Sequence, residues 1–103
     1  MPDFGADVTV EVSGETATLA ISGEVDLASA PGLREEFQRV DAPNVVVDLS
    51  GVTFIDSTGL GVLVAALKRT REAGGRLTLR SPTRSTRKVL DITGLSQLVA
   101  IED

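Results

Sequence analysis

The sequence predicts one α/β domain over residues 1–103, in which a mixed β-sheet is covered by helices in the order β-β-α-β-α-β-α-β. Three observations predict this class. Alternating apolar and polar residues open the chain, a nearly continuous apolar run lies at its centre, and segments with helical apolar spacing separate the later strands. With 103 residues, 42% of them hydrophobic and 24% charged, the chain can build one core but not two.

The N-terminal half is expected to form a β-hairpin followed by a helix. Three valines between residues 8 and 12 alternate with polar residues, residues 16–22 alternate again, and Gly14 between the two runs supplies the turn. Ser29 can cap a helix over about residues 30–40, in which apolar side chains recur at helical spacing.

The centre of the chain predicts a buried strand and a second helix. Residues 44–49 contain three consecutive valines and a leucine, a run typical of a mid-sheet strand that is covered on both faces. The next helix is expected to end at Gly74-Gly75. Its inward stripe follows the spacing i, i+3, i+4, i+7 and comprises Leu60, Leu63, Val64 and Leu67.

The C-terminal part predicts a strand, a helix and a last strand. A short strand is marked by Leu77 and Leu79, and a third helix, which carries Val89, Leu90 and Ile92, is expected to stop at Gly94. Residues 97–101 then complete the sheet. The strand–helix–strand connections imply right-handed crossovers.

The composition excludes several classes of function. The chain has no cysteine and no histidine, so thiolate nucleophiles, the commonest general base and the commonest zinc ligand are absent, and we expect no metal, no cofactor and no catalytic residue. The longest apolar stretch, residues 60–67, is far shorter than the ~18 residues of a membrane span. The N-terminus does not resemble a signal peptide, so we expect a cytoplasmic protein without a membrane partner.

Charge is distributed unevenly along the chain. Residues 1–56 carry eleven acidic and two basic side chains, whereas residues 57–103 carry four acidic and eight basic ones. All eight basic residues lie between Lys68 and Lys88. A nucleic-acid patch is not expected, because the whole chain is acidic and no aromatic residue lies among these cations to stack on bases. Solvated surface is the favoured interpretation, and docking of a protein partner is the alternative.

The loop from Val52 to Gly61 carries the most information about function. Ser57 lies at or next to the N-cap of the second helix, and capping alone would explain a Ser-Thr pair there. However, Gly59 and Gly61 both lie in the first turn, where each costs the helix up to about 1 kcal/mol relative to alanine. Two missing side chains would leave the backbone beside Ser57 open to another protein. Gly59-Leu60-Gly61 does not continue into the three-glycine pattern of a dinucleotide-binding loop, and the sequence contains no Walker motif.

The outer face of the second helix is the second candidate surface. If Leu60 and its stripe face inward, the side chains of Thr58, Val62, Ala65 and Arg69 point outward. Three of these four carry no charge, which is unusual for a solvated helix face. A partner that reaches Ser57 could cover this face, or a neighbouring element of the domain could bury it.

Several motifs together resemble the anti-sigma factor antagonists of the STAS domain family. They are Gly23-Glu24-Val25-Asp26, Asp56-Ser57-Thr58-Gly59-Leu60-Gly61, Gly74-Gly75 and Thr93-Gly94-Leu95. The resemblance implies a STAS-type sheet and a phosphorylation site at Ser57, with Asp26 beside it. It implies a partner, an anti-sigma factor that is also a serine/threonine kinase, and a phosphatase that reverses the modification. The unphosphorylated form would bind the anti-sigma factor and free a sigma factor to activate transcription.

The partner-binding surface expected from the resemblance and from the outer helix face includes eight residues: Asp26, Asp56, Ser57, Thr58, Gly59, Gly61, Val62 and Ala65. STAS domains also occur in transporters and stressosomes, so an interaction module of another signalling or transport assembly is the alternative function.

Two rival classes are less compatible with the residues. A response-regulator receiver needs a basic residue after its last strand, and nothing after Lys88 is basic. An enzyme could use Asp26 and Asp56 as paired carboxylates for acid–base work or Mg²⁺ binding. Two aspartates are few for an active site, and aspartate is also a common capping or turn residue. We therefore expect a binding protein and not an enzyme.

Overall fold

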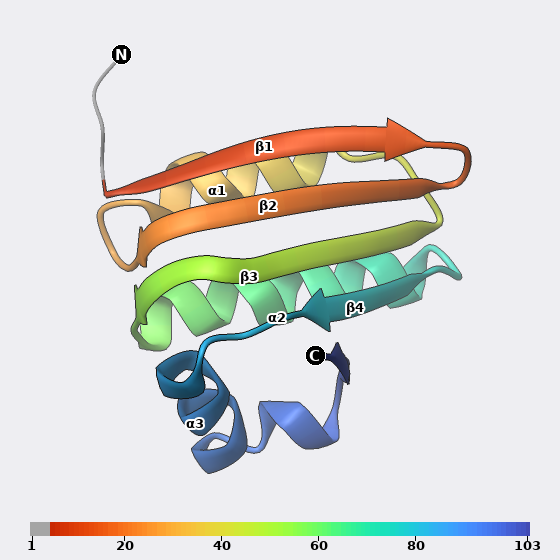
Figure 1. The fold of residues 1–103 in the computed structure, drawn as a ribbon. Coiled ribbons are helices and arrows are strands. Elements are labelled where there is room, and N and C mark those ends of the chain that lie inside the picture. Colours follow the sequence, from red (N-terminus) through yellow and green to blue (C-terminus); the bar gives the residue numbers. More distant parts are fainter. Residues whose placement is uncertain (1–4) are drawn as a thin grey trace.

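Five strands form one mixed sheet in the spatial order β1-β2-β3-β4-β5 in the structure, a computed structural model that describes residues 5–103 (Figure 1). β1 pairs antiparallel with β2, and the other neighbours are parallel. The strands are β1 (Ala6–Ser13), β2 (Thr16–Val25), β3 (Asn44–Ile55), β4 (Arg76–Arg80) and β5 (Ala100–Glu102). The predicted element order is confirmed, whereas what was predicted for residues 1–4 lies outside the described residues.

Helices connect the parallel strands, and two of them lie side by side behind the sheet in Figure 1. These two are α1 (Ala30–Arg39) and α2 (Ser57–Glu72). The third, α3 (Arg84–Ile92), packs against β3 and is followed by the 3₁₀ turn η1 (Leu95–Gln97). None of the helices within residues 5–103 is long and apolar enough to cross a bilayer.

The core lies between one face of the sheet and the helices. Strand side chains that point toward α1 and α2 are almost fully buried, with Leu19, Val47 and Leu79 at most 1% exposed. The alternate residues of β3, Val46 and Asp48, are only half-buried. The prediction that the central strand is covered on both faces is therefore wrong.

β3 continues six residues beyond its predicted end, because a bulge lets it follow β2 to the end of that strand. The pairing shifts between Ala20↔Asp48 and Ser22↔Gly51. A Cβ on Gly51 would lie 2.8 Å from the Cβ of Ser22, so the backbones approach more closely here than a side chain allows. The apolar run used for the prediction covers only the regular half of the strand.

The last strand differs from its prediction. Residues 97–101 were expected to be extended, but the 3₁₀ turn occupies 95–97 and the strand is restricted to 100–102. Leu95, the first residue of the turn, and Val99, two residues after it, are buried, while Leu98 is 59% exposed. A run of apolar residues therefore suggested one strand where the chain actually turns between two buried anchors.

Asp48 gives the fold a specific pH dependence. The backbone N–H of Ser50 donates to Asp48 Oδ1 at 2.9 Å, and this bond, helped by the Ser50 hydroxyl and Arg80, lowers the pKa of Asp48 below its ordinary value of 3.8. A carboxyl with a lowered folded-state pKa stabilises the protein above its unfolded-state pKa, and the contribution is lost as the pH falls through the folded value.

An Asp48→Asn variant should therefore be less stable than the wild type at pH 7, and the difference should shrink below about pH 4. Asparagine keeps an oxygen to accept the Ser50 N–H, so the comparison isolates the charge. Urea unfolding at pH 7 and pH 3 measures it, with the exposed Asp41→Asn as the matched control. A stability difference that does not change with pH would contradict the assignment.

Candidate functional site

The candidate site lies where β2 and β3 end. Val25 pairs with Ile55 in the parallel register, so Asp26 and Asp56 are the next residue on each strand. The backbone N–H of Asp56 donates to the Val25 carbonyl at 3.2 Å and joins the two loops. Parallel strands bring their carboxyl ends to one edge of a sheet, the usual position of ligand sites in such folds. Both loops emerge at this edge, in keeping with the position of Asp26 beside Ser57 that the resemblance implies.

Asp56, and not Ser57, caps α2. Its backbone is extended, and its Oδ1 accepts a hydrogen bond from the Gly59 N–H at 2.9 Å. Ser57 is consequently the first helical residue, and it is exposed. Its hydroxyl makes no hydrogen bond within residues 5–103. Because the aspartate stabilises the helix end, the serine hydroxyl remains available for chemistry.

Asp26 is held in a tight turn before α1. Its Oδ1 accepts from the N–H groups of Ala28 and Ser29 at 3.1 and 3.2 Å. Ser29 occupies the predicted N-cap position of α1, but its hydroxyl makes no cap bond and donates instead to the Glu24 carbonyl at 2.8 Å. These bonds fix the Asp26 carboxylate at the same sheet edge as Ser57.

The two glycines of the first turn have different roles. A Cβ on Gly59 would lie 2.2 Å from the Val25 carbonyl oxygen, whereas one on Gly61 would meet nothing within 4 Å. Gly59 is buried, so the expectation that it exposes backbone to a partner is wrong. Its missing side chain lets α2 approach the end of β2. Only Gly61 leaves exposed backbone one turn beyond Ser57.

Replacement of each glycine by alanine should separate these roles. Gly59→Ala forces the backbones apart and should destabilise the domain by about 2 kcal/mol or more, since overpacking outweighs the gain in helix propensity. Gly61→Ala should stabilise it by up to about 1 kcal/mol. Urea unfolding of both variants measures the difference. Equal effects of the two substitutions would contradict the assignment.

The buried face of α2 is rotated toward α1 relative to the prediction. Val62 is 1% exposed and Val64 is 46% exposed, the reverse of what was expected. Ala65 and Arg69 are exposed as predicted, and Thr58 is half-buried. The helix packs on α1 as well as on the sheet, so its apolar side must face both neighbours. Val62 therefore faces the space between α1 and α2 and is not part of an exposed outer helix face.

Exposed apolar side chains near Ser57 were missed by the sequence analysis. Leu27, next to Asp26, is 73% exposed, and Phe54, two residues before Asp56, is 50% exposed. Val64 lies two turns along α2 from Ser57. A large apolar residue inside a loop, directly after an aspartate, was the available signal for Leu27. Exposed apolar side chains of this kind are typical of surfaces that bind other proteins.

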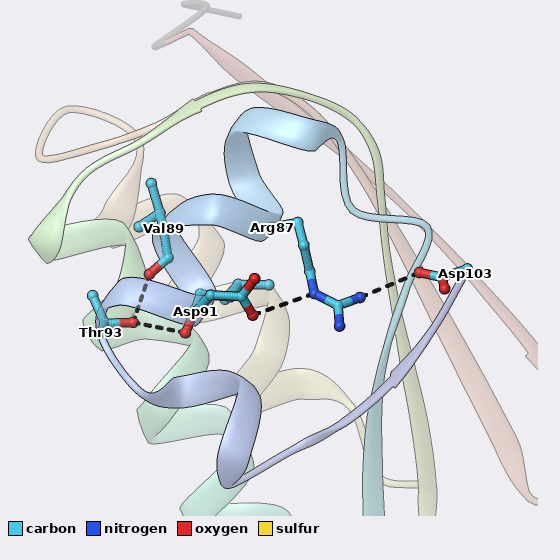
Figure 2. A network of polar contacts seen from close by, with 6 residues as sticks. Arg87, Val89, Asp91, Thr93 and Asp103 are labelled. Carbon is cyan, nitrogen blue, oxygen red and sulfur yellow. Dashed lines mark hydrogen bonds and ion pairs between the residues drawn. The ribbon is translucent and has the colours of Figure 1, made fainter.

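The basic residues between Lys68 and Lys88 are spread over several elements, and four of the eight join one segment to another. Arg71 donates to the Leu98 carbonyl, and Arg80 pairs with Glu102 at 2.9 Å. Figure 2 shows Arg87 between Asp91 on α3 and Asp103 at the chain end, at 3.4 and 3.3 Å. This distribution supports the interpretation as ordinary surface more than that of one anion-binding patch.

The charge at the site is negative. Glu24, Asp26 and Asp56 lie at this edge, and the first basic residue of α2 is Lys68, about 16 Å along the helix from Ser57 at 1.5 Å per residue. Within residues 5–103 no three acidic side chains gather closely enough to hold a metal ion. The site therefore presents a serine hydroxyl and a helix N-terminus among carboxylates.

Curated relatives and solved structures resemble the chain over nearly its whole length. The anti-sigma-B factor antagonist of Bacillus subtilis (strain 168) is 34% identical over 97 residues, which are 92% of this chain and 89% of the relative. That of Listeria monocytogenes is 34% identical over 86 residues, 81% and 75% of the two chains. The crystal structure of an anti-sigma factor antagonist from Mycobacterium paratuberculosis has a TM-score of 0.87 at 27% identity, covering 98% of this chain and 88% of that one.

The family model described as "Mlab, STAS domain" matches residues 8–100. Both the predicted STAS-type sheet and the predicted family are confirmed by these similarities. This chain belongs to the STAS domain family.

Proposed function

We propose that this chain is an anti-sigma factor antagonist that is switched by phosphorylation of Ser57. In its unphosphorylated form it binds an anti-sigma factor that is also a serine/threonine kinase, and so frees a sigma factor in the cytoplasm. A phosphatase acting on phospho-Ser57 restores binding. One observation carries the proposal: the Ser57 hydroxyl is exposed and makes no hydrogen bond to any described residue, because Asp56 caps the helix in its place. The names of the curated relatives support it.

The phosphoryl group would act through its charge. It adds about −1.5 to −2 charges at pH 7, next to the carboxylates of Asp26 and Asp56. The N–H groups of Ser57 and Thr58 make no hydrogen bond within residues 5–103, so they can stabilise the added anion at the helix N-terminus. The folded domain thus tolerates the phosphoryl group, whereas a partner whose surface fits the neutral serine would bind the phosphorylated form more weakly.

The proposed contact surface follows from exposure. Ser57, Gly61 and Ala65 lie one above the other on successive turns of α2, with Asp26 and Thr58 beside the first turn. Gly59 shapes this surface from within the domain and does not touch the partner, and Val62 does not lie on this exposed row of α2. No catalytic residue is proposed, because the kinase supplies the chemistry and this chain is its substrate.

The experiment is a phosphorylation assay. The purified domain should stay unmodified with ATP and Mg²⁺ alone and become phosphorylated after the anti-sigma factor, captured from its native cell with the unphosphorylated domain, is added. Tandem mass spectrometry should locate the phosphate on Ser57, and Ser57→Ala should remain unmodified. Turnover of ATP by the domain alone, or modification at Thr58 instead, would contradict the proposal. Capture of a transporter or another signalling assembly would favour the alternative function.

An Asp26→Asn variant should be phosphorylated several-fold more slowly, with an unchanged melting temperature. Asparagine can still accept the N–H groups of Ala28 and Ser29, so the turn persists while the charge beside Ser57 is removed. Initial rates under the same kinase measure the effect, and Glu15→Gln in the hairpin is the control for a distant charge. Equal rates in all three proteins would reduce Asp26 to a turn residue.

A further inference from the structure

A groove between α1 and α2 borders the surface proposed above and shares only Ala65 with it. It encloses about 150 Å³. Its floor is formed by Phe37, Val62 and Ala66, which are at most 7% exposed. Arg34 and Gln38 from α1 and Arg69 from α2 form its rim. A space of this size accepts one benzene-sized group, such as a single large apolar side chain.

The charges around the groove have one sign. Arg34 and Arg69 are its only charged lining residues, and the acidic residues of α1, Glu35 and Glu36, are not part of the lining. Arg69 Nη2 donates to the Gln38 carbonyl at 2.9 Å, which fixes its guanidinium across the two helices. The Arg34 side chain makes no interaction within residues 5–103. The groove therefore combines an apolar floor with two guanidinium groups that can donate hydrogen bonds to carboxylates of a partner.

The groove also continues the surface proposed for the switch. Ala65, in its lining, lies two turns beyond Ser57, about 12 Å along α2. The surface is thus negative around Ser57 and positive at the groove. A partner bound along α2 has to match both ends, so the two charges fix its direction on the helix.

We propose that the groove is the second anchor of the anti-sigma factor, and that it binds one large apolar side chain flanked by carboxylates. This proposal rests on the proposed function. Because the lining of the groove on α2 begins at Val62, more than one turn beyond Ser57, phosphorylation leaves it unchanged, and the two anchors contribute separately to affinity. The negative edge at Ser57 carries the regulation, while the groove adds affinity and orientation.

The test measures the Kd of the captured anti-sigma factor for three variants of the unphosphorylated domain. Arg34→Glu reverses one rim charge, and Ala65→Phe fills the groove without changing charge. Arg76→Glu, on the opposite face of the sheet, is the matched control for charge reversal. The first two should each weaken binding about tenfold or more, and the control by less than about twofold. Arg34→Glu should also make the affinity less dependent on salt.

The outcomes distinguish the groove from the switch. Wild-type affinity of both groove variants, together with lost binding after Ser57 phosphorylation, would overturn the groove and leave the switch standing. Weak binding of the groove variants with no effect of phosphorylation would support the groove and overturn the switch. Capture of no anti-sigma factor would overturn both. If sedimentation showed that Ala65→Phe changes self-association of the domain, a second copy of the chain would be the occupant and the proposal would be wrong.

Discussion

Phosphorylation of Ser57 should weaken binding of the anti-sigma factor at least a hundredfold, a loss of about 2.7 kcal/mol. The added charge lies beside Asp26 and Asp56, so a partner surface that fits this acidic edge meets a larger negative charge. Ser57→Glu, with one added charge, should lose affinity in the same direction but to a smaller extent. Calorimetric titration of the phosphorylated and unphosphorylated proteins measures the effect.

Two controls accompany this prediction. Ser57→Ala should bind like the wild type, because it adds no charge and Asp56 still caps α2. The melting temperatures of the wild type and the phosphorylated protein should be similar, which shows that binding is lost without unfolding. If phosphorylation leaves the affinity unchanged, Ser57 is not the switch.

Val62→Asp should destabilise the domain by at least about 3 kcal/mol more than Val64→Asp. Both substitutions place the same poor helix former inside α2, so their shared propensity cost cancels. Val62 is 1% exposed, and aspartate is too short to carry its charge out of the packed surface between α1 and α2. Val64 is 46% exposed, and its aspartate stays in water.

Urea unfolding at pH 7 measures both variants, and the Val62→Asp protein should show the lower midpoint or no folded baseline. Repeating the experiment near pH 4 should reduce the difference, because a protonated carboxyl is easier to bury. Equal stabilities would mean that α2 has the orientation expected from its sequence, with Val62 in solvent.

The fold could be predicted where one periodicity dominates a segment. β1 and β2 alternate strictly, and Gly14, with a φ of +60°, allows the turn between them. The limits of β3 and β5 could not be predicted in the same way. A bulge at Gly51 and a 3₁₀ turn at Leu95 each interrupt the apolar period locally. Both depend on how the segment packs against neighbouring backbone, which the local sequence does not specify.

The candidate site was predicted in its position but not in its details. The register of parallel strands places Asp26 next to Asp56, and the order of elements alone makes this expected. The orientation of α2 could not be predicted, because Val62 and Val64 are equally apolar and only the position of α1 decides between them. The sequence likewise does not distinguish Gly59, which packs on Val25, from Gly61, which leaves exposed backbone.

Asp56 caps α2, while Ser57 is the residue that we propose is phosphorylated. This division between two residues should affect the lifetime of the protein. Degradation in a cell depends on the population of unfolded chains, which follows the free energy of unfolding. Since Asp56 supplies the cap and Ser57 makes no internal hydrogen bond among the described residues, both signalling forms should unfold to the same extent. If the domain is switched as proposed, proteases should remove both forms at equal rates. The cell could then hold the domain in either state for long periods without changing how much of it is present.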